Sequence, residues 1–289
     1  MIALVATMCL AALHGDALLV STNQLANVTD VLVVDARSPE AYAKGHIPGA
    51  VNLDVDTLSE NKGDVAGVLK PFSVLRRLLS KAGVDPSKHL VVYSGMDSVG
   101  DFKAATRLFW ILEYVGYERV SVLDGGFAKW KAENRDVAKG APDVEPVDIP
   151  KLEPRADRIA TYKEVQEAIK NGDATIEDLR SPAYFSGEKK ADVVKKAGHI
   201  PSANNMPADA FLSDTDRTVK PATDLDKLTE EANVKPETPV ITYCNTGRSA
   251  SVGYFIMRRT GHDNVSLYDG SMSEWTNKRK PVETDTEKK

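Results

Sequence analysis

An internal repeat is the feature that most constrains the fold of this chain. The segment from Val31 to Asn52 reads VLVVDARSPEAYAKGHIPGAVN, and the segment from Ala174 to Asn205 reads ATIEDLRSPAYFSGEKKADVVKKAGHIPSANN. Both contain a D-x-R-S-P stretch followed by a GHIP stretch, and the second copy is longer between these two landmarks. A repeat on this scale predicts two domains of similar structure.

Further landmarks extend the repeat toward the end of each copy. The apolar run that ends in Tyr93-Ser94 returns as the run that ends in Tyr243-Cys244, and each copy then carries a D-G-x4-W motif. The first copy is the longer one just after its Tyr-Ser pair. Because both differences in length follow an expected strand, we interpret them as differences between loops.

Within each copy, short β-branched runs alternate with segments of helical periodicity. In the first copy we expect strands at 31–34, 51–53, 90–93 and 120–123, and helices at 73–81 and 102–115. Strands that are apolar throughout and alternate with helices predict an α/β fold in which a mainly parallel sheet has helices on both faces. Chemistry in such folds lies at the carboxyl ends of the strands. Asp35, Ser94, Asp178 and Cys244 fall there.

Length and composition suit a two-domain globular protein, with 289 residues, 42% of them hydrophobic and 27% charged. The net charge of −5 gives no indication of nucleic-acid binding. Two cysteines and five histidines make a disulfide framework or a metal site unexpected. We expect domains at 18–137 and 159–280, a proline-rich linker at 138–158 and a polar tail at 281–289.

Residues 1–17 have features of a secretory signal peptide. The run from Ile2 to Leu13 is almost wholly apolar; at about 12 residues it is too short for a stable membrane anchor but matches a signal-peptide core. Gly15 and Ala17 are small residues that suit a cleavage site, whereas no Lys or Arg precedes the apolar run. Two interpretations follow: export, with a periplasmic location, or a buried N-terminal helix in a cytoplasmic protein.

Cys244 is the residue best placed for chemistry. It ends an expected strand, and the expected helix at 249–260 follows a short loop. The loop residues are Asn245, Thr246, Gly247, Arg248 and Ser249. Loop amides that converge because Gly247 permits a positive φ, together with a helix N-terminus, favour negative charge on sulfur. The alternative is an inert buried cysteine.

The first copy lacks this cysteine. Ser94 occupies the equivalent strand end, its loop is longer, and no base is visible beside it in the sequence. A hydroxyl needs activation that a thiolate does not. We therefore expect the first domain to be inactive, and residues common to both copies to be structural. These are the Asp-Arg pairs (Asp35 and Arg37, Asp178 and Arg180), His46, His199, Trp130 and Trp275.

Two copies of D-x-R-S-P…GHIP, a D-G-x4-W motif near each end and a C-x-x-G loop in the second copy alone resemble the tandem-domain rhodanese sulfurtransferases over residues 18 to 280. The resemblance implies two rhodanese-like α/β domains, one of them catalytic, with the active site near their interface. It also implies that Cys244 accepts a sulfane sulfur from a donor such as thiosulfate as a persulfide and passes it to cyanide or a thiol. That mechanism requires neither a metal nor an organic cofactor.

The residues around Cys244 are candidate substrate ligands. Asn245, Thr246, Gly247 and Ser249 offer backbone or side-chain donors to a negatively charged sulfur. Arg248 has two interpretations: it holds an anionic donor, or it points outward to a surface carboxylate.

An insert at 184–197, present only in the cysteine-bearing copy, is rich in lysine. It either steers anionic donors toward Cys244 or is a solvated surface loop, and we include Tyr184 and Lys196 among the candidate ligands. Tyr184 stands where well-known members of the resembling family carry a substrate-binding arginine. The loop CNTGRS matches neither the version linked to thiosulfate nor the one linked to 3-mercaptopyruvate, so both donors stay open.

Two other functions compete with an enzymatic sulfur transfer. Cys-dependent phosphatases and arsenate reductases of related fold use C-x5-R, but that arginine position is Ala250 here. A non-enzymatic persulfide carrier needs the same cysteine loop as the enzyme, and the sequence does not separate the two.

Overall fold

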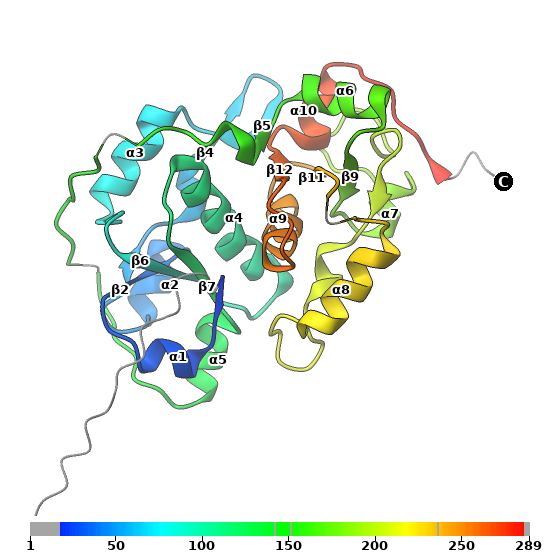
Figure 1. Ribbon diagram of the computed structural model, residues 1–289. Helices are drawn as coiled ribbons and strands as arrows, with labels where there is room; N and C mark the ends of the chain where they lie inside the picture. Colours follow the sequence, from blue (N-terminus) through cyan, green and yellow to red (C-terminus); the bar gives the residue numbers. More distant parts are fainter. Residues whose placement is uncertain (1–17, 142, 151, 236, 286–289) are drawn as a thin grey trace, which may run out of the picture.

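The computed structural model describes residues 18–141, 143–150, 152–235 and 237–285, which form two α/β halves side by side (Figure 1). The strands of the first sheet are β1 (Leu19–Val20), β2 (Val31–Asp35), β3 (Val51–Asn52), β6 (His89–Tyr93) and β7 (Val120–Leu123). Those of the second are β8 (Ile159–Ala160), β9 (Thr175–Asp178), β10 (Asn204–Asn205), β11 (Val240–Tyr243) and β12 (Val265–Tyr268). The orders β1-β7-β6-β2-β3 and β8-β12-β11-β9-β10 match strand for strand, and all neighbours are parallel. The predicted parallel α/β fold is confirmed.

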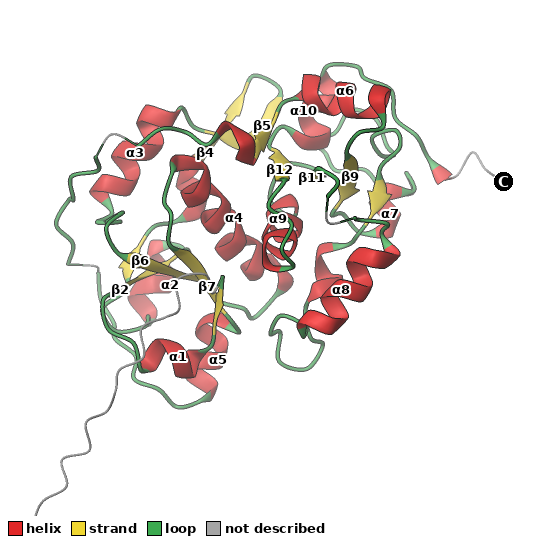
Figure 2. Cartoon of the chain, in the orientation of Figure 1, coloured by secondary structure: helices red, strands yellow, loops and turns green. Residues whose placement is uncertain are grey.

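Helices connect the strands in both halves (Figure 2). The first half contains α1 (Thr22–Ala26), α2 (Pro39–Lys44), α3 (Phe72–Lys81), α4 (Val99–Val115) and α5 (Gly126–Ala132). The second contains α6 (Tyr162–Asn171), α7 (Pro182–Phe185), α8 (Ala222–Glu231), α9 (Ala250–Arg259) and α10 (Ser271–Asn277). The 3-10 turns are η1 (Val55–Leu58), η2 (Ala156–Arg158) and η3 (Ala208–Phe211). The predicted elements are present with shifts of up to three residues, and Thr161 and Glu164 form a capping box at the start of α6.

Each sheet is covered on both faces, as predicted. On the outer face of the first sheet, Leu25 of α1, Tyr42 of α2 and Trp130 of α5 form one apolar cluster. On the outer face of the second sheet, Val165 of α6 and Trp275 of α10 belong to the corresponding cluster. Each tryptophan is buried and therefore has a packing role, with its indole N–H donating to a backbone carbonyl.

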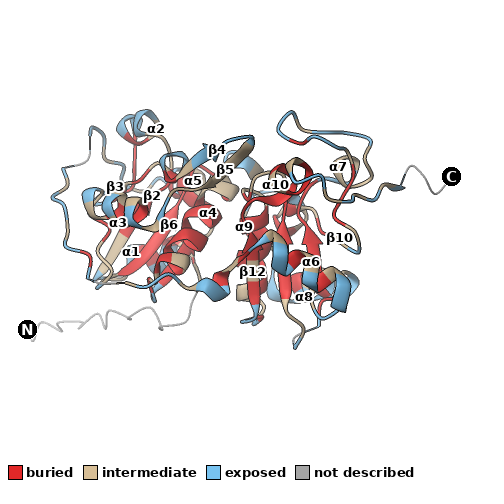
Figure 3. Cartoon of the chain, turned by 90° about the horizontal axis from the view of Figure 1, so that it is seen from above, coloured by how far each residue is buried: buried red, intermediate tan, exposed pale blue. Residues whose placement is uncertain are grey.

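The inner faces of the two sheets share a single core. Buried side chains of α4 and α9 belong to one cluster that continues into both halves, and Figure 3 shows these buried helices at the middle of the molecule. Phe109 packs edge to face on Phe255, with ring centroids 5.1 Å apart. The halves are thus similar in topology but bury a common interior.

The two helices cross near an approximate two-fold axis. Thr106 of α4 and Ser251 of α9 occupy equivalent positions in the repeat, and their hydroxyl oxygens are 3.0 Å apart. Phe109 and Tyr254 are equivalent too, and their rings lie 6.4 Å apart. Equivalent residues meet only where a two-fold axis passes, so the repeat in sequence is also a symmetry of the interface.

A hairpin not predicted from the sequence reaches across this interface. Strands β4 (Ser59–Lys62) and β5 (Val65–Leu69) pair antiparallel around a two-residue turn in which Gly63 has φ = 59°. The hairpin contacts the second half: the Ala66 N–H donates to Ser273 Oγ at 2.9 Å, and Asn277 donates to the Asp64 carbonyl at 2.8 Å. The first domain therefore covers part of the cysteine-bearing domain.

The proline-rich connection between the halves is extended but bound to the first domain. The Val147 N–H donates to the Ser80 carbonyl at 3.0 Å, Arg76 donates to the Ile149 carbonyl at 2.9 Å, and Ile149 is buried. The predicted signal segment 1–17 lies outside the described residues. Among the helices that are described, none is both long and apolar enough to cross a bilayer.

Candidate active site

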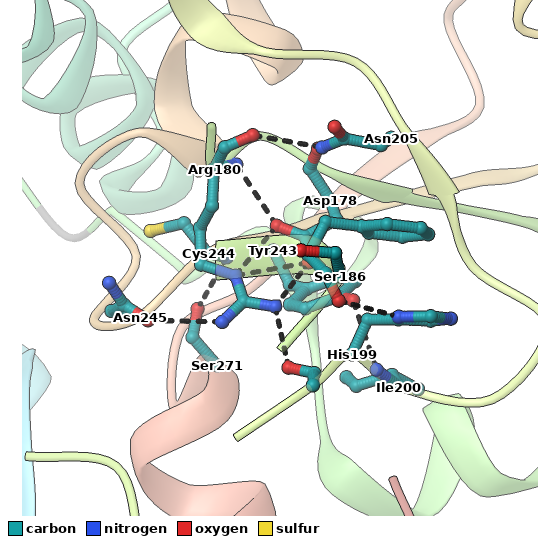
Figure 4. Close-up of polar contacts among 12 residues, drawn as sticks. Asp178, Arg180, Ser186, His199, Ile200, Asn205, Tyr243, Cys244, Asn245 and Ser271 are labelled. Carbon is teal, nitrogen blue, oxygen red and sulfur yellow. Dashed lines mark hydrogen bonds and ion pairs between the residues drawn. The ribbon is translucent and has the colours of Figure 1, made fainter. Parts of the chain in front are cut away.

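Cys244 lies at the carboxyl end of β11, just before α9 begins, and is only 3% exposed. Its N–H donates to Ser271 Oγ at 3.1 Å, and its carbonyl accepts from the Met272 N–H at 3.0 Å. Figure 4 shows the thiol beside the side chains of Arg180, Asn245 and Ser271. The contacts with Ser271 and Met272 therefore fix the backbone of Cys244 on one side, and the sulfur faces the loop.

The loop after Cys244 has unpaired backbone donors. Gly247 adopts φ = 78°, as predicted, but its own N–H is engaged by Ser271 Oγ at 3.1 Å and is not available to an anion. In the described part of the chain no partner is found for four other loop amides. They belong to Asn245, Thr246, Arg248 and Ser249. Four unpaired N–H groups next to a thiol form an arrangement suited to an anionic sulfur.

Ser271 holds the loop in place, and sequence reasoning missed it. Its hydroxyl accepts the N–H groups of Cys244 and Gly247 and donates to the Tyr268 carbonyl at 2.8 Å. Ser271 adopts φ = 49°, a left-handed conformation that glycine normally occupies. The first copy has Gly126 at this position, also with φ = 49°. The sequence does contain one signal for Ser271: a serine follows D-G in the second copy, where a glycine follows it in the first.

The shared Asp-Arg pairs are ion pairs of a buried aspartate, consistent with their structural interpretation. Arg180 Nη2 lies 2.6 Å from Asp178 and donates to the Gly198 carbonyl at 2.9 Å, as Arg37 does with Asp35 and Gly45. Burial lowers the pKa of Arg180, but Asp178, together with the nearby Tyr243 and Cys244, raises it, and the pKa lies above its usual value. Arg180 also reaches Asn245 Oδ1 at 3.4 Å, so the pair buttresses the loop.

Arg248 pairs with a carboxylate of the other domain. It forms an ion pair with Asp56, and the two side chains are 35% and 71% exposed. A hollow of about 310 Å³ lies between the Cys244 loop and the first domain, and both residues line it with Glu60, Thr246 and Gly67. The interpretation of Arg248 as partner to a surface carboxylate thus agrees with the structure, but this carboxylate belongs to the interdomain site.

Arg107 of α4 is a second residue that sequence reasoning missed. It is 1% exposed, and it contacts Asp269 at 2.6 Å and the carbonyl of Gly247 at 3.3 Å. The signal was an arginine inside the apolar stretch RLFWIL, at a position equivalent to Val252 in the repeat.

Two candidate ligands have their recorded contacts elsewhere than in the loop. Tyr184 lies in α7, and its N–H donates to the Ser181 carbonyl; Lys196 lies in the insert, whose Lys195 N–H donates to Thr276 of α10 at 3.0 Å. No hydrogen bond or ion pair within the described residues joins Tyr184 or Lys196 to the Cys244 loop. Their role in binding stays a prediction.

The histidines common to both copies, and Ser94 of the first copy, have structural contacts. His46 stacks on Tyr42 and His199 on Phe185, each at 3.7 Å, and each histidine Nδ1 lies near a backbone carbonyl. Ser94 is buried and donates to the Asp101 carbonyl at 2.6 Å, so its hydroxyl proton is held by the backbone and not by a general base. Across the described ranges, no three His, Cys, Asp or Glu side chains are grouped to hold a metal ion.

Comparison with known protein families agrees with this geometry. The model of the rhodanese-like domain matches twice, at residues 21–133 and 161–278. A thiosulfate sulfurtransferase of Azotobacter vinelandii is 33% identical over 251 residues, covering 86% of this chain and 89% of the relative. A 3-mercaptopyruvate sulfurtransferase of Escherichia coli K12 is 30% identical over 261 residues, covering 85% and 89%.

Solved structures give the same result. The crystal structure of SseA from Escherichia coli, described as a 3-mercaptopyruvate sulfotransferase with the rhodanese fold, superposes with a TM-score of 0.77 at 27% identity, covering 88% of this chain and 98% of that one. YnjE superposes with a TM-score of 0.80 at 28% identity, covering 89% of this chain and 63% of the longer YnjE chain.

Proposed function

The chain belongs to the rhodanese-like family of tandem-domain sulfurtransferases, and on that premise we propose that it transfers a sulfane sulfur from a small anionic donor to a thiophilic acceptor through a persulfide on Cys244. The observation that carries the proposal is the thiol at the end of β11 beside four unpaired loop amides. The equivalent strand end of the first domain carries Ser94, whose hydroxyl is engaged by a backbone carbonyl.

The reaction has two displacement steps. With thiosulfate, the Cys244 thiolate attacks the outer sulfur, the S–S bond of the donor breaks, and sulfite leaves with the bonding electron pair. The persulfide then carries its negative charge on the outer sulfur, where the free amides of the loop stabilise it. Cyanide or a thiolate next attacks that sulfur, which leaves as thiocyanate or as a new persulfide, and the Cys244 thiolate is regenerated.

We propose thiosulfate as the first donor to test. A thiol that is 3% exposed favours a small donor, and Arg248 lies in the loop with a guanidinium that can pair with a sulfonate-like group. Relatives at about the same identity act on thiosulfate or on 3-mercaptopyruvate, so both donors are to be compared at equal concentration.

Intact mass spectrometry after incubation with the donor tests the proposal. We expect a gain of about 32 Da, one sulfur atom on a thiolate nucleophile, which cyanide then removes. Cys244→Ser abolishes the gain, and Ser94→Ala, a matched change at the equivalent strand end, leaves it intact. A wild-type protein that gains no sulfur from either donor contradicts the proposal.

Turnover separates an enzyme from a persulfide carrier. Steady thiocyanate formation over many equivalents of protein indicates an enzyme, whereas a single burst that stops indicates a carrier. Cys244-dependent hydrolysis of p-nitrophenyl phosphate would instead indicate a phosphatase; Ala250 in place of the phosphate-binding arginine argues against that outcome.

We also propose that residues 1–17 form a signal peptide and that the mature protein is periplasmic. The support is the length of the apolar run and the small residues before Leu18. N-terminal sequencing of the protein from the periplasmic fraction tests this; a retained Met1 contradicts it.

A further inference from the structure

Arg107 connects the cysteine-free domain to the Cys244 loop. It projects from α4, is 1% exposed, and forms an ion pair with Asp269 at 2.6 Å. Its Nη1 donates to the Gly247 carbonyl and its Nη2 to the Gly67 carbonyl, each at 3.3 Å. One planar guanidinium thus contacts the loop, the aspartate of the D-G motif and the β4–β5 hairpin.

The repeat provides an internal comparison for this contact. Asp124, the equivalent of Asp269, accepts the Val219 N–H at 2.9 Å, and Asp269 accepts the Leu69 N–H at 2.8 Å. Each domain therefore uses its D-G aspartate to accept an N–H from the other domain. The equivalent of Arg107 is Val252. Of these two equivalent positions, position 107 carries the arginine, and its side chain faces the loop that carries the cysteine.

The contact fixes the Gly247 residue from both sides. Its carbonyl accepts from Arg107, and its N–H donates to Ser271 Oγ. A Cβ at Gly247 would lie 2.6 Å from Arg107 Nη1, so the two groups are packed as closely as glycine allows. Because Gly247 is central to the loop, its orientation sets where the amides on either side point.

We propose that Arg107 is a positioning residue for sulfur transfer: from the cysteine-free domain it holds the Gly247 carbonyl and thereby keeps the free loop amides directed at the Cys244 sulfur. This inference rests on the proposed function. Arg107 does not act by its charge, because Asp269 neutralises it at 2.6 Å. It acts through the geometry of the loop.

Three variants separate positioning from a merely structural role. Arg107→Lys keeps a cation for Asp269 but loses the fork that also reaches Gly247. Arg107→Met with Asp269→Asn removes both charges and leaves no buried ion unpaired. Arg158→Met is the matched control: Arg158 is another buried arginine near α4, and it donates to the Asp263 carbonyl at 2.7 Å, away from the loop.

Two readouts are measured on full-length protein. The first is the rate of iodoacetamide alkylation of Cys244 against pH, followed by peptide mass spectrometry. The second is the kcat and KM of thiocyanate formation from thiosulfate. For Arg107→Lys and for the double variant we expect an alkylation midpoint about one pH unit higher and a kcat about tenfold lower, since misdirected amides no longer stabilise sulfur charge. KM should change less than twofold because the donor contacts remain.

The control and the double variant decide the outcome. Arg158→Met should lose stability in urea yet keep the wild-type midpoint and kcat. Wild-type behaviour of Arg107→Lys, or of the double variant, overturns the inference, because either shows that Arg107 serves only as a counter-ion. An equal change in Arg158→Met also overturns it, since any loosening of the interface then suffices. Alkylation requires no sulfur donor, so it tests the role of Arg107 even if the proposed function is wrong. A wrong proposed function is detected separately, as a wild-type protein that gains no sulfur.

Discussion

The two halves of this molecule have the same strand order, yet they differ at the few positions that surround one strand end. The first half has Ser94, Gly126 and, across the interface, Val252; the second has Cys244, Ser271 and Arg107. Ser271 in place of glycine and Arg107 in place of valine each add a polar group that hydrogen-bonds to the Cys244 loop. The site is therefore a local departure from an otherwise symmetric framework, and one of its parts comes from the half that lacks the cysteine.

A second difference lies within the sheets. In the first half Val34 of β2 pairs in register with Val51 of β3; in the second, Glu177 of β9 pairs with Asn204 of β10. Glu177 is fully buried, and its Oε1 accepts from Asn204 Nδ2 at 3.0 Å. Burial raises the pKa of Glu177 from 4.5 to about 8, and the Asn204 hydrogen bond opposes that rise. The cysteine-bearing half thus carries a titratable group where its counterpart has an apolar contact.

Exchanging the two strand-end residues tests whether the site depends on its surroundings. The double variant Cys244→Ser with Ser94→Cys should lose sulfur transfer by at least about a thousandfold, as expected when a nucleophile is removed. The thiol moved to position 94 enters a longer loop without the contacts of Ser271 and Arg107. Thiocyanate formation measures the effect, and persulfide formation at position 94 would show that the loop is dispensable.

Removing the Ser271 hydroxyl, which the equivalent Gly126 lacks, should have the next largest effect on sulfur transfer. Ser271→Ala leaves two buried N–H groups unpaired, each worth about 1–3 kcal/mol, and keeps a side chain at φ = 49°. Ser271→Gly loses the same hydroxyl but removes the backbone strain, so it should be the more stable of the two in urea. Both variants should lower kcat about tenfold or more, since the loop loses the two hydrogen bonds that the Ser271 hydroxyl accepts.

Ser273→Ala is the matched control for these variants. Ser273 is also a buried α10 serine, but it accepts the hairpin Ala66 N–H instead of a loop amide. Its kcat should stay close to wild type, and an equal loss there would remove the special role of Ser271.

Glu177→Gln should change the pH dependence of stability. The folded-state pKa of about 8 lies above the ordinary 4.5, so the folded protein keeps a proton that the unfolded chain releases between these values. The contribution of Glu177 to the free energy of unfolding is therefore fully present below about pH 4.5. It falls as the pH rises toward 8, by up to about 1.4 kcal/mol per pH unit. Urea unfolding of wild type against the glutamine variant at pH 5.5, 7 and 8 isolates this contribution. Parallel curves for the two proteins would show that the carboxyl does not titrate in this range.

Asp56→Asn is expected to give the smallest change. Asp56 competes with an anionic donor for Arg248, but exposed ion pairs are worth about 1 kcal/mol or less. We expect the KM for thiosulfate to fall about two- to fivefold at low ionic strength and the difference to shrink in high salt. Asp30→Asn, at an exposed carboxylate that pairs with Lys88 instead of Arg248, controls for net charge. A KM that rises in Asp56→Asn would contradict the competition.

Sequence patterns were sufficient for the fold and for the identity of the candidate nucleophile. Alternating apolar strands and helices predicted both sheets, and the repeat separated Cys244 from the shared Asp-Arg pairs. Ser271, Arg107 and the β4–β5 hairpin were missed because their contacts depend on which faces of the halves meet. Arg107 lies more than a hundred residues from Gly247 in sequence, and no local periodicity specifies that contact.

The common interior of α4 and α9 makes each half an incomplete protein. Separated at the linker, either half would expose the aromatic face formed by Phe102, Phe109 or Phe255 to water, an apolar patch of the kind that drives association. The chain should therefore unfold in a single calorimetric transition despite its two sheets. Two fragments produced separately should recover sulfur transfer only when mixed, as subunits of a dimer do.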